Sequence, residues 1–178
     1  LDASDTGSLL VDGSNRVSKW FDKSGNNNTA YQITTANQPV LTPTSPINSL
    51  PAVTFSDASN SSTNADWLRV PTTAFNNTNG SLIVVMRQTD ASENNDIVFM
   101  ATELAYGQSD AFHNGDGHDG QNIMEIQLGK NGNGFLYQDG TNILEVNSTT
   151  QSNINLIARA TWDRTGDLSF TNAENVTA

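Results

Sequence analysis

The chain has 178 residues, enough for one domain with a buried core, and no cysteine, which excludes disulfides and thiolate chemistry. Eight basic and 19 acidic residues give a net charge of −11, which repels phosphate backbones and argues against nucleic acid as a partner. No apolar run approaches the roughly 18 residues of a membrane-spanning helix, so we expect no membrane insertion.

Neutral polar residues supply most of the polarity. Charged residues make up 15% of the chain, yet the mean hydropathy is −0.44, and 23 residues are asparagine. Asn, Ser and Gly are poor helix-interior residues and favour turns. The composition therefore predicts short strands joined by Asn/Gly turns.

The first half of the chain begins with two predicted strands and then becomes rich in proline. Four prolines in 36–51 predict an ordered crossing loop or a sheet edge, because proline cannot donate to a β-ladder. Further on, 81–87 is apolar on both faces, which is typical of a strand in the middle of a sandwich. The predicted strands up to this point are 9–11, 17–21, 52–55, 67–70 and 81–87.

The second half alternates between apolar and polar residues and is punctuated by turns. Residues 123–128 alternate strictly, and 131–134 (Asn-Gly-Asn-Gly) and Asp139-Gly140 predict hairpin turns. About eleven short strands at this spacing indicate an all-β sandwich or jelly roll. The strands predicted here are 97–101, 123–128, 135–138, 143–146, 155–162 and 168–171.

Two motifs carry a family resemblance. Trp20, Asp22, Ser24, Gly25 and Asn26 form a Trp-x-Asp-x-Ser-Gly-Asn block, and Pro-Ala-Val-x-Phe follows at 51–55. In this order, and with the later stretch NLIARATWDRTGDLSF, they resemble laminin-G-like jelly-roll modules of bacterial and phage surface proteins, in the concanavalin A-like lectin/glucanase superfamily. The resemblance implies an antiparallel jelly-roll β-sandwich forming a single domain over 1–178. The closing hairpin of the family is missing. We expect a module excised from a longer multidomain chain, and the alternative is a sandwich that is closed differently.

The loop from about Tyr106 to Asn122 is the candidate functional segment, and we call it the candidate calcium loop. Calcium takes six to eight oxygen ligands from carboxylates, amides and carbonyls. Glycines within such a loop let backbone carbonyls turn toward an ion. The loop does not have the EF-hand pattern, because no glutamate closes a twelve-residue loop opened by one of its aspartates. The alternative to a calcium site is a solvated acidic loop. We expect calcium to be held by Asp110, Asn114, Asp116, Asp119 and Gln121.

The same loop contains both histidines and two aromatic residues near its start. Zinc is an alternative ion there, although the spacing matches no zinc motif. The aromatic side chains either form a ligand platform or anchor the loop. The expected ligand-binding residues are Tyr106, Phe112, His113, His118 and Asn122.

Other conspicuous residues have structural interpretations. Asp22 and Ser24 are expected to tie a tight turn by bonding backbone amides. Large aromatic residues outside the loop are expected in the core. The acidic cluster at 90–96 is expected to be a solvated hairpin tip, with a minor cation site as the alternative. The aromatic residues assigned to the core are Trp20, Phe55, Trp67 and Trp162.

Catalysis is not expected. Glucanases of the superfamily that this chain resembles carry Glu-x-Asp-x-x-Glu on one strand, which places two carboxylates close together. Here Glu125 is followed by Gln127 and Lys130 at the other two positions.

The sequence therefore predicts a non-catalytic, calcium-dependent ligand-binding module of an extracellular or cell-surface adhesin, similar to modules of repeats-in-toxin adhesins. Its expected partners are a cell-surface glycan or peptide and other domains of the same long chain. The alternatives are a structural or decoration domain of a phage or cell-surface assembly, and a degenerate glycan-active enzyme.

Overall fold

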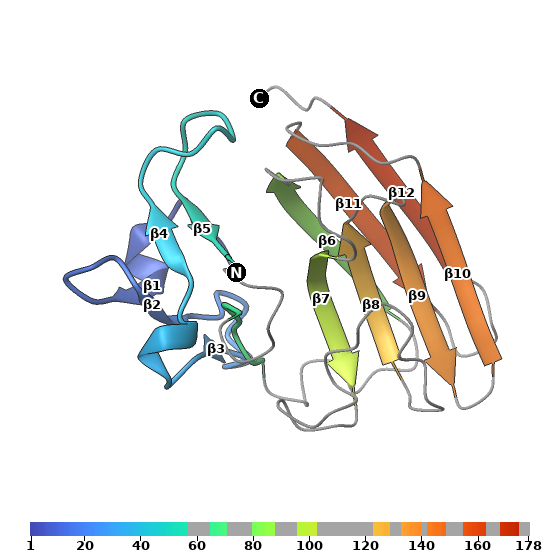
Figure 1. Ribbon diagram of the computed structural model, residues 1–178, viewed down its shortest axis with the longest axis horizontal. Helices are drawn as coiled ribbons and strands as arrows, with labels where there is room; N and C mark the ends of the chain where they lie inside the picture. The colour runs from blue at the N-terminus through green and yellow to red at the C-terminus, as the bar shows by residue number, and fades with distance from the viewer. Residues whose placement is uncertain are drawn as a thin grey trace. The chain divides into compact units, whose positions relative to one another are not determined.

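The computed structural model describes 1–56, 65–70, 80–87, 96–102, 123–128, 133–139, 142–148, 155–162 and 168–174. Within these ranges the chain forms twelve strands and two single-turn 3₁₀ segments, with no α-helix (Figure 1). The expected all-β class is confirmed. The chain divides into two compact parts, the N-terminal unit (Leu1–Asn76) and the C-terminal unit (Asn77–Ala178).

The N-terminal unit contains two small antiparallel sheets. The first has the order β1-β2-β3, from Leu9–Val11, Val17–Trp20 and Ala30–Tyr31. The second pairs β4 (Val40–Thr42) with β5 (Ala52–Thr54). The 3₁₀ turns are η1 (Thr6–Ser8) and η2 (Thr35–Asn37). The sequence did not predict β3 and β4, because two or three residues are too short to show an alternating pattern.

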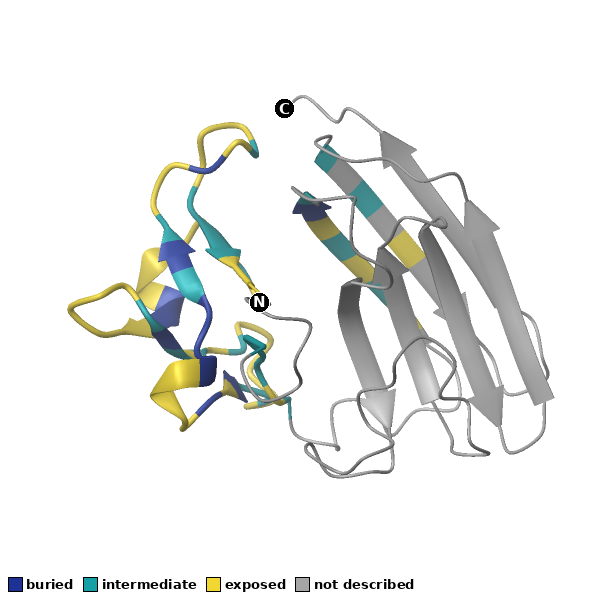
Figure 2. Cartoon of the chain, viewed as in Figure 1, coloured by how far each residue is buried: buried dark blue, intermediate teal, exposed yellow. Residues whose placement is uncertain are grey.

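A small apolar cluster forms the core of this unit. Leu9, Val17 and Leu41 are buried together, and Trp20 and Val53 pack against them. Figure 2 shows buried positions, in dark blue, among the strands of this unit. The cluster joins the two sheets, since its members come from β1, β2, β4 and β5. The expected core position of Trp20 is thus confirmed, although its side chain is partly exposed.

The proline-rich stretch is an ordered connection that contains β4, and Val40 of β4 bridges to Arg16 as well as pairing with Thr54 of β5. Pro39 is fully buried, and its carbonyl accepts the Val17 N–H at 2.7 Å, after which β4 forms one side of a two-stranded sheet. Proline serves here as an acceptor and needs no N–H, which is why it is tolerated beside a strand.

Buried amides fix the segment 65–70 to the rest of the unit. The Asn37 side chain donates to the Ala65 carbonyl at 2.9 Å, and the Trp67 N–H donates to the Asn37 carbonyl at 3.0 Å. Gln38 donates to the Gln32 carbonyl at 2.8 Å. These partners explain why polar side chains are buried here without a large penalty.

Two predictions for this unit are wrong. Residues 67–70 do not form a strand, because their backbone pairs with β3 through a single bridge between Arg69 and Tyr31 before Pro71. Phe55 is exposed because it follows the last paired residue of β5, where the ladder no longer holds the chain against the core.

The described residues of the C-terminal unit form seven longer strands in two antiparallel sheets. One has the order β12-β11-β6, from Leu168–Glu174, Asn155–Trp162 and Gly80–Arg87. The other has the order β10-β9-β8-β7, from Asn142–Ser148, Asn133–Asp139, Ile123–Leu128 and Asp96–Thr102. The predicted hairpins β8–β9 and β9–β10 are both present, with antiparallel pairing up to their turns.

Cross-strand register in the four-stranded sheet brings apolar residues of all four strands together in two rows. Opposite residues lie on the same face of a sheet, and successive rows alternate between faces. One row contains Ala101, Met124, Tyr137 and Leu144. A second row two positions along contains Phe99, Ile126, Phe135 and Val146. One face of this sheet is therefore apolar, as the alternation in 123–128 predicted.

The expected central position of 81–87 is wrong. The strand β6 lies on the outside of its three-stranded sheet, and Ile83 and Val85 are 62% and 59% exposed while Met86 is buried. An apolar run is compatible with burial on both faces but does not require it, since the neighbouring elements decide what is covered.

Candidate functional site

The expected calcium and ligand residues all fall outside the described part of the chain, in the segment 103–122. Their assignment stays a prediction. They are Tyr106, Asp110, Phe112, His113, Asn114, Asp116, His118, Asp119, Gln121 and Asn122. Most of the acidic cluster 90–96 and the side chain of Trp162 also lie outside it.

The strands that bracket this segment are described. The strand β7 ends at Thr102 and β8 begins at Ile123, and these two residues are directly paired in an antiparallel ladder. Opposite residues in such a ladder have Cα atoms roughly 5 Å apart. The connection therefore leaves and re-enters the sheet at one place.

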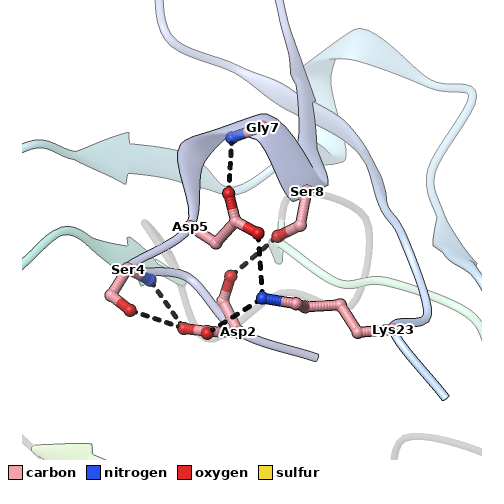
Figure 3. Close-up of polar contacts among 6 residues, drawn as sticks. All are labelled: Asp2, Ser4, Asp5, Gly7, Ser8 and Lys23. Carbon is pink, nitrogen blue, oxygen red and sulfur yellow. Dashed lines mark hydrogen bonds and ion pairs between the residues drawn. The ribbon is translucent and has the colours of Figure 1, made fainter.

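A polar cluster near the N-terminus was not anticipated from the sequence. The Lys23 ammonium lies 2.8 Å from an Asp5 carboxylate oxygen and 3.4 Å from one of Asp2 (Figure 3). Ser4 donates to Asp2 from both its backbone and its hydroxyl, at 3.0 Å and 2.7 Å. Asp2 and Asp5 lie before β1, whereas Lys23 follows β2, so antiparallel pairing of these strands brings them together.

The polar contacts in this cluster shift the pKa values of its charged groups. Hydrogen bonds from the Ser4 hydroxyl, and then from its backbone and from Lys23, lower the pKa of Asp2. The hydrogen bond from Lys23 lowers the pKa of Asp5, and the same contact raises the pKa of Lys23. The cluster thus fastens the N-terminal segment to the loop after β2. Its carboxylates are already satisfied by an ammonium and a hydroxyl.

The predicted structural role of Asp22 is confirmed. Its carboxylate accepts the Ser24 N–H and hydroxyl, both at 2.8 Å, and the Asn28 N–H at 2.9 Å. The backbone donors of Ser24 and Asn28, followed by the Ser24 hydroxyl, lower the pKa of Asp22. The side chain therefore closes a turn by satisfying backbone donors, as Asx turns do.

Asp12 performs the same task between β1 and β2. Its carboxylate accepts the N–H groups of Arg16 and Ser14 at 2.9 Å and 2.8 Å, which lower its pKa. Asn15 in this turn has a φ of 62°, a left-handed conformation that asparagine tolerates better than most residues.

No group of three or more acidic or histidine side chains that could hold a metal ion occurs in the described ranges.

The register also shows an acidic pair that spacing along the chain does not reveal. Glu125 of β8 and Glu145 of β10 share one row, with Leu136 between them and Met100 beyond Glu125. Two strand spacings of about 4.8 Å separate the backbones of the two glutamates.

Comparison with known proteins gave no match to this chain: no family model, no curated protein and no solved structure is significantly similar to it. No helix in the described ranges is long and apolar enough to cross a membrane.

Proposed function

We propose that this chain is a non-catalytic ligand-binding module of an extracellular adhesin, and that calcium bound in the 106–122 loop controls its ligand binding. The observation that carries the proposal is the placement of an oxygen-rich, glycine-rich segment between the paired residues Thr102 and Ile123. A rigid sheet that presents a long loop is the usual arrangement for a binding site.

Charge supports a role for a cation. The C-terminal unit carries 13 acidic and four basic residues, a formal charge of −9, and the N-terminal unit only −2. A bound divalent ion reverses the local field and can accept a ligand oxygen as one of its own ligands. The proposed partner is a cell-surface glycan or peptide, recognised through a hydroxyl or carboxylate on calcium. Calcium-binding modules outside the cell work at the high free calcium found there, which fits the proposed location.

The proposed architecture of the C-terminal unit is a jelly-roll sandwich of its two sheets. Two features support it. One face of the four-stranded sheet is apolar and therefore needs a cover. In addition, the outer strands β10 and β12, which belong to different sheets, come into contact. This architecture agrees with the resemblance to concanavalin A-like modules.

The decisive experiment is a thermal melt in calcium and in chelator, with Asp116→Ala/Asp119→Ala beside the wild type. An ion that binds only the folded state at a hundredfold excess over its Kd adds about 2.7 kcal/mol to the stability. We expect a shift of this order in the wild type and none in the double variant. A matched control, Asp163→Ala/Asp167→Ala, removes the same charge between β11 and β12 and should keep the shift.

A calcium shift that survives Asp116→Ala/Asp119→Ala would overturn the assignment of the ion to the loop. No shift in the wild type would favour the structural or decoration role, which the exposed Ile83 and Val85 on β6 also favour because they suit a protein contact. If the ion contacts the ligand, excess chelator must release a bound glycan or peptide.

A further inference from the structure

A row of exposed side chains crosses the first sheet of the N-terminal unit. The register pairs Leu10 with Lys19, Lys19 with Tyr31, and Tyr31 with Arg69. Tyr31 and Arg69 exchange both backbone hydrogen bonds, each at 2.9 Å, so this end of the row is firmly fixed. Directly opposite residues lie on one face, which places two cations on either side of one aromatic ring.

This face points to solvent. The residues that alternate with the row, Leu9, Ala30 and Gln32, are buried on the other face, whereas every member of the row is exposed. Ile33, two positions beyond Tyr31, is 86% exposed. A tyrosine that is 38% exposed between two exposed cations is not explained by packing.

The two cations have no electrostatic task within the described part of the unit. Lys23 is paired with Asp2 and Asp5, and Arg16 donates to the carbonyls of Thr35 and Gln38. Lys19 and Arg69 make no ion pair or side-chain hydrogen bond with another described residue.

Three carboxylates in the described part of this unit already accept hydrogen bonds from other groups. Asp12 and Asp22 close their turns, and Asp66 accepts both the backbone and the hydroxyl of Ser56, at 3.0 Å and 2.8 Å. Lys19 and Arg69 therefore concentrate positive charge on one face of a chain that is acidic as a whole.

We propose that this cationic-aromatic row, Lys19–Tyr31–Arg69 with Leu10 at its end, binds a carboxylate-bearing saccharide. A guanidinium matches a carboxylate with two parallel hydrogen bonds, and an ammonium supplies a compact second charge. A tyrosine ring offers a flat apolar surface to a sugar ring. Two strand spacings separate Lys19 and Arg69 by about 10 Å, so both can reach acidic groups on a chain that lies over Tyr31.

Other anionic partners fit less well. Peptides add to a sheet edge or enter an apolar groove, whereas this row lies on an open face. Nucleic acid carries a dense row of charges that a net charge of −11 repels. An acidic oligosaccharide offers fewer charges and a stacking surface. The row lies wholly in the N-terminal unit, so the proposal does not depend on the calcium loop.

The test is titration calorimetry of the intact chain with oligogalacturonate, in excess chelator so that calcium takes no part. Its methyl ester, which keeps the sugar rings but removes the charge, is the matched ligand. We expect the acid to bind, and the ester to bind at least about tenfold more weakly, since charged hydrogen bonds are lost. Lys19→Gln/Arg69→Gln should also weaken binding at least about tenfold, and Tyr31→Ala should weaken it with the charges intact.

The matched protein control is Lys23→Gln, which removes one positive charge from the same unit away from the row and should leave binding nearly unchanged. Circular dichroism melts check that each variant is folded. The proposal is overturned if oligogalacturonate does not bind at millimolar concentration, if Lys19→Gln/Arg69→Gln binds like the wild type, or if Lys23→Gln loses as much. Equal binding of an oligoglutamate peptide would instead identify an acidic peptide as the partner.

Discussion

Replacing Val17 by alanine tests the core of the N-terminal unit. The Val17 side chain is fully buried in the cluster with Leu9 and Leu41. Each buried methyl group removed costs about 0.8 kcal/mol of transfer free energy, so two cost about 1.6 kcal/mol. Incomplete collapse of the cavity raises the expected loss of unfolding free energy to about 2–3 kcal/mol. The backbone bond from Val17 to Pro39 is retained, because alanine keeps its N–H.

Val11 provides the matched control for this substitution. It lies opposite Val17 in the same ladder, beside a register shift, and is 37% exposed. Val11→Ala should cost less than about 0.5–1 kcal/mol. The assay is urea denaturation of the intact chain followed by tryptophan fluorescence, since Trp20 packs against the cluster. If Val17→Ala cost no more than Val11→Ala, Val17 would not belong to a close-packed core and the reasoning would fail.

The remaining predictions concern charges, a turn and β6. NMR titration of the intact chain should place the pKa values of Asp2 and Asp5 below their ordinary 3.8. Because the folded-state pKa is lowered, the stability that these carboxylates contribute is present above about pH 3.8 and is lost as the pH falls through the folded pKa. Lys23→Gln should raise the pKa of Asp5 more than that of Asp2, whose largest stabilising contact is with Ser4; an equal rise would contradict the assigned contacts. Asp22→Ala should speed amide hydrogen exchange at Ser24 and Asn28, which donate to that carboxylate, while Asp12→Ala should leave both amides unchanged. Met86→Ala should cost about 2 kcal/mol or more, and the exposed Val85→Ala less than about 0.5–1 kcal/mol; similar costs would refute the assignment of the two faces of β6.

Local chemistry could be predicted where it depends on neighbours in the chain. The turn at Asp22 follows from an aspartate that accepts backbone N–H groups a few residues on, and the structure has these bonds. The strands Leu9–Val11, Ile123–Leu128 and Asn155–Trp162 have their predicted ends, because turn residues flank them closely. The predictions were wrong where packing against elements distant in the sequence decides whether a segment pairs as a strand or is covered. Residues 67–70 have strand-like composition but pair at one position, and the run 81–87 lies on the outside of a sheet.

The sequence alone determined the all-β class, the turns and the oxygen-rich composition of the 106–122 loop, since these depend on local backbone preferences and residue type. Tertiary structure decided which distant residues share a face. Lys19, Tyr31 and Arg69 lie far apart in the sequence, yet strand register places them in one row. It also paired Thr102 with Ile123, so that the chain leaves and re-enters the sheet at one place on either side of the segment that contains the candidate calcium loop. The physical reason is that register is set by the burial of the opposite face of the sheet, which no short segment encodes by itself.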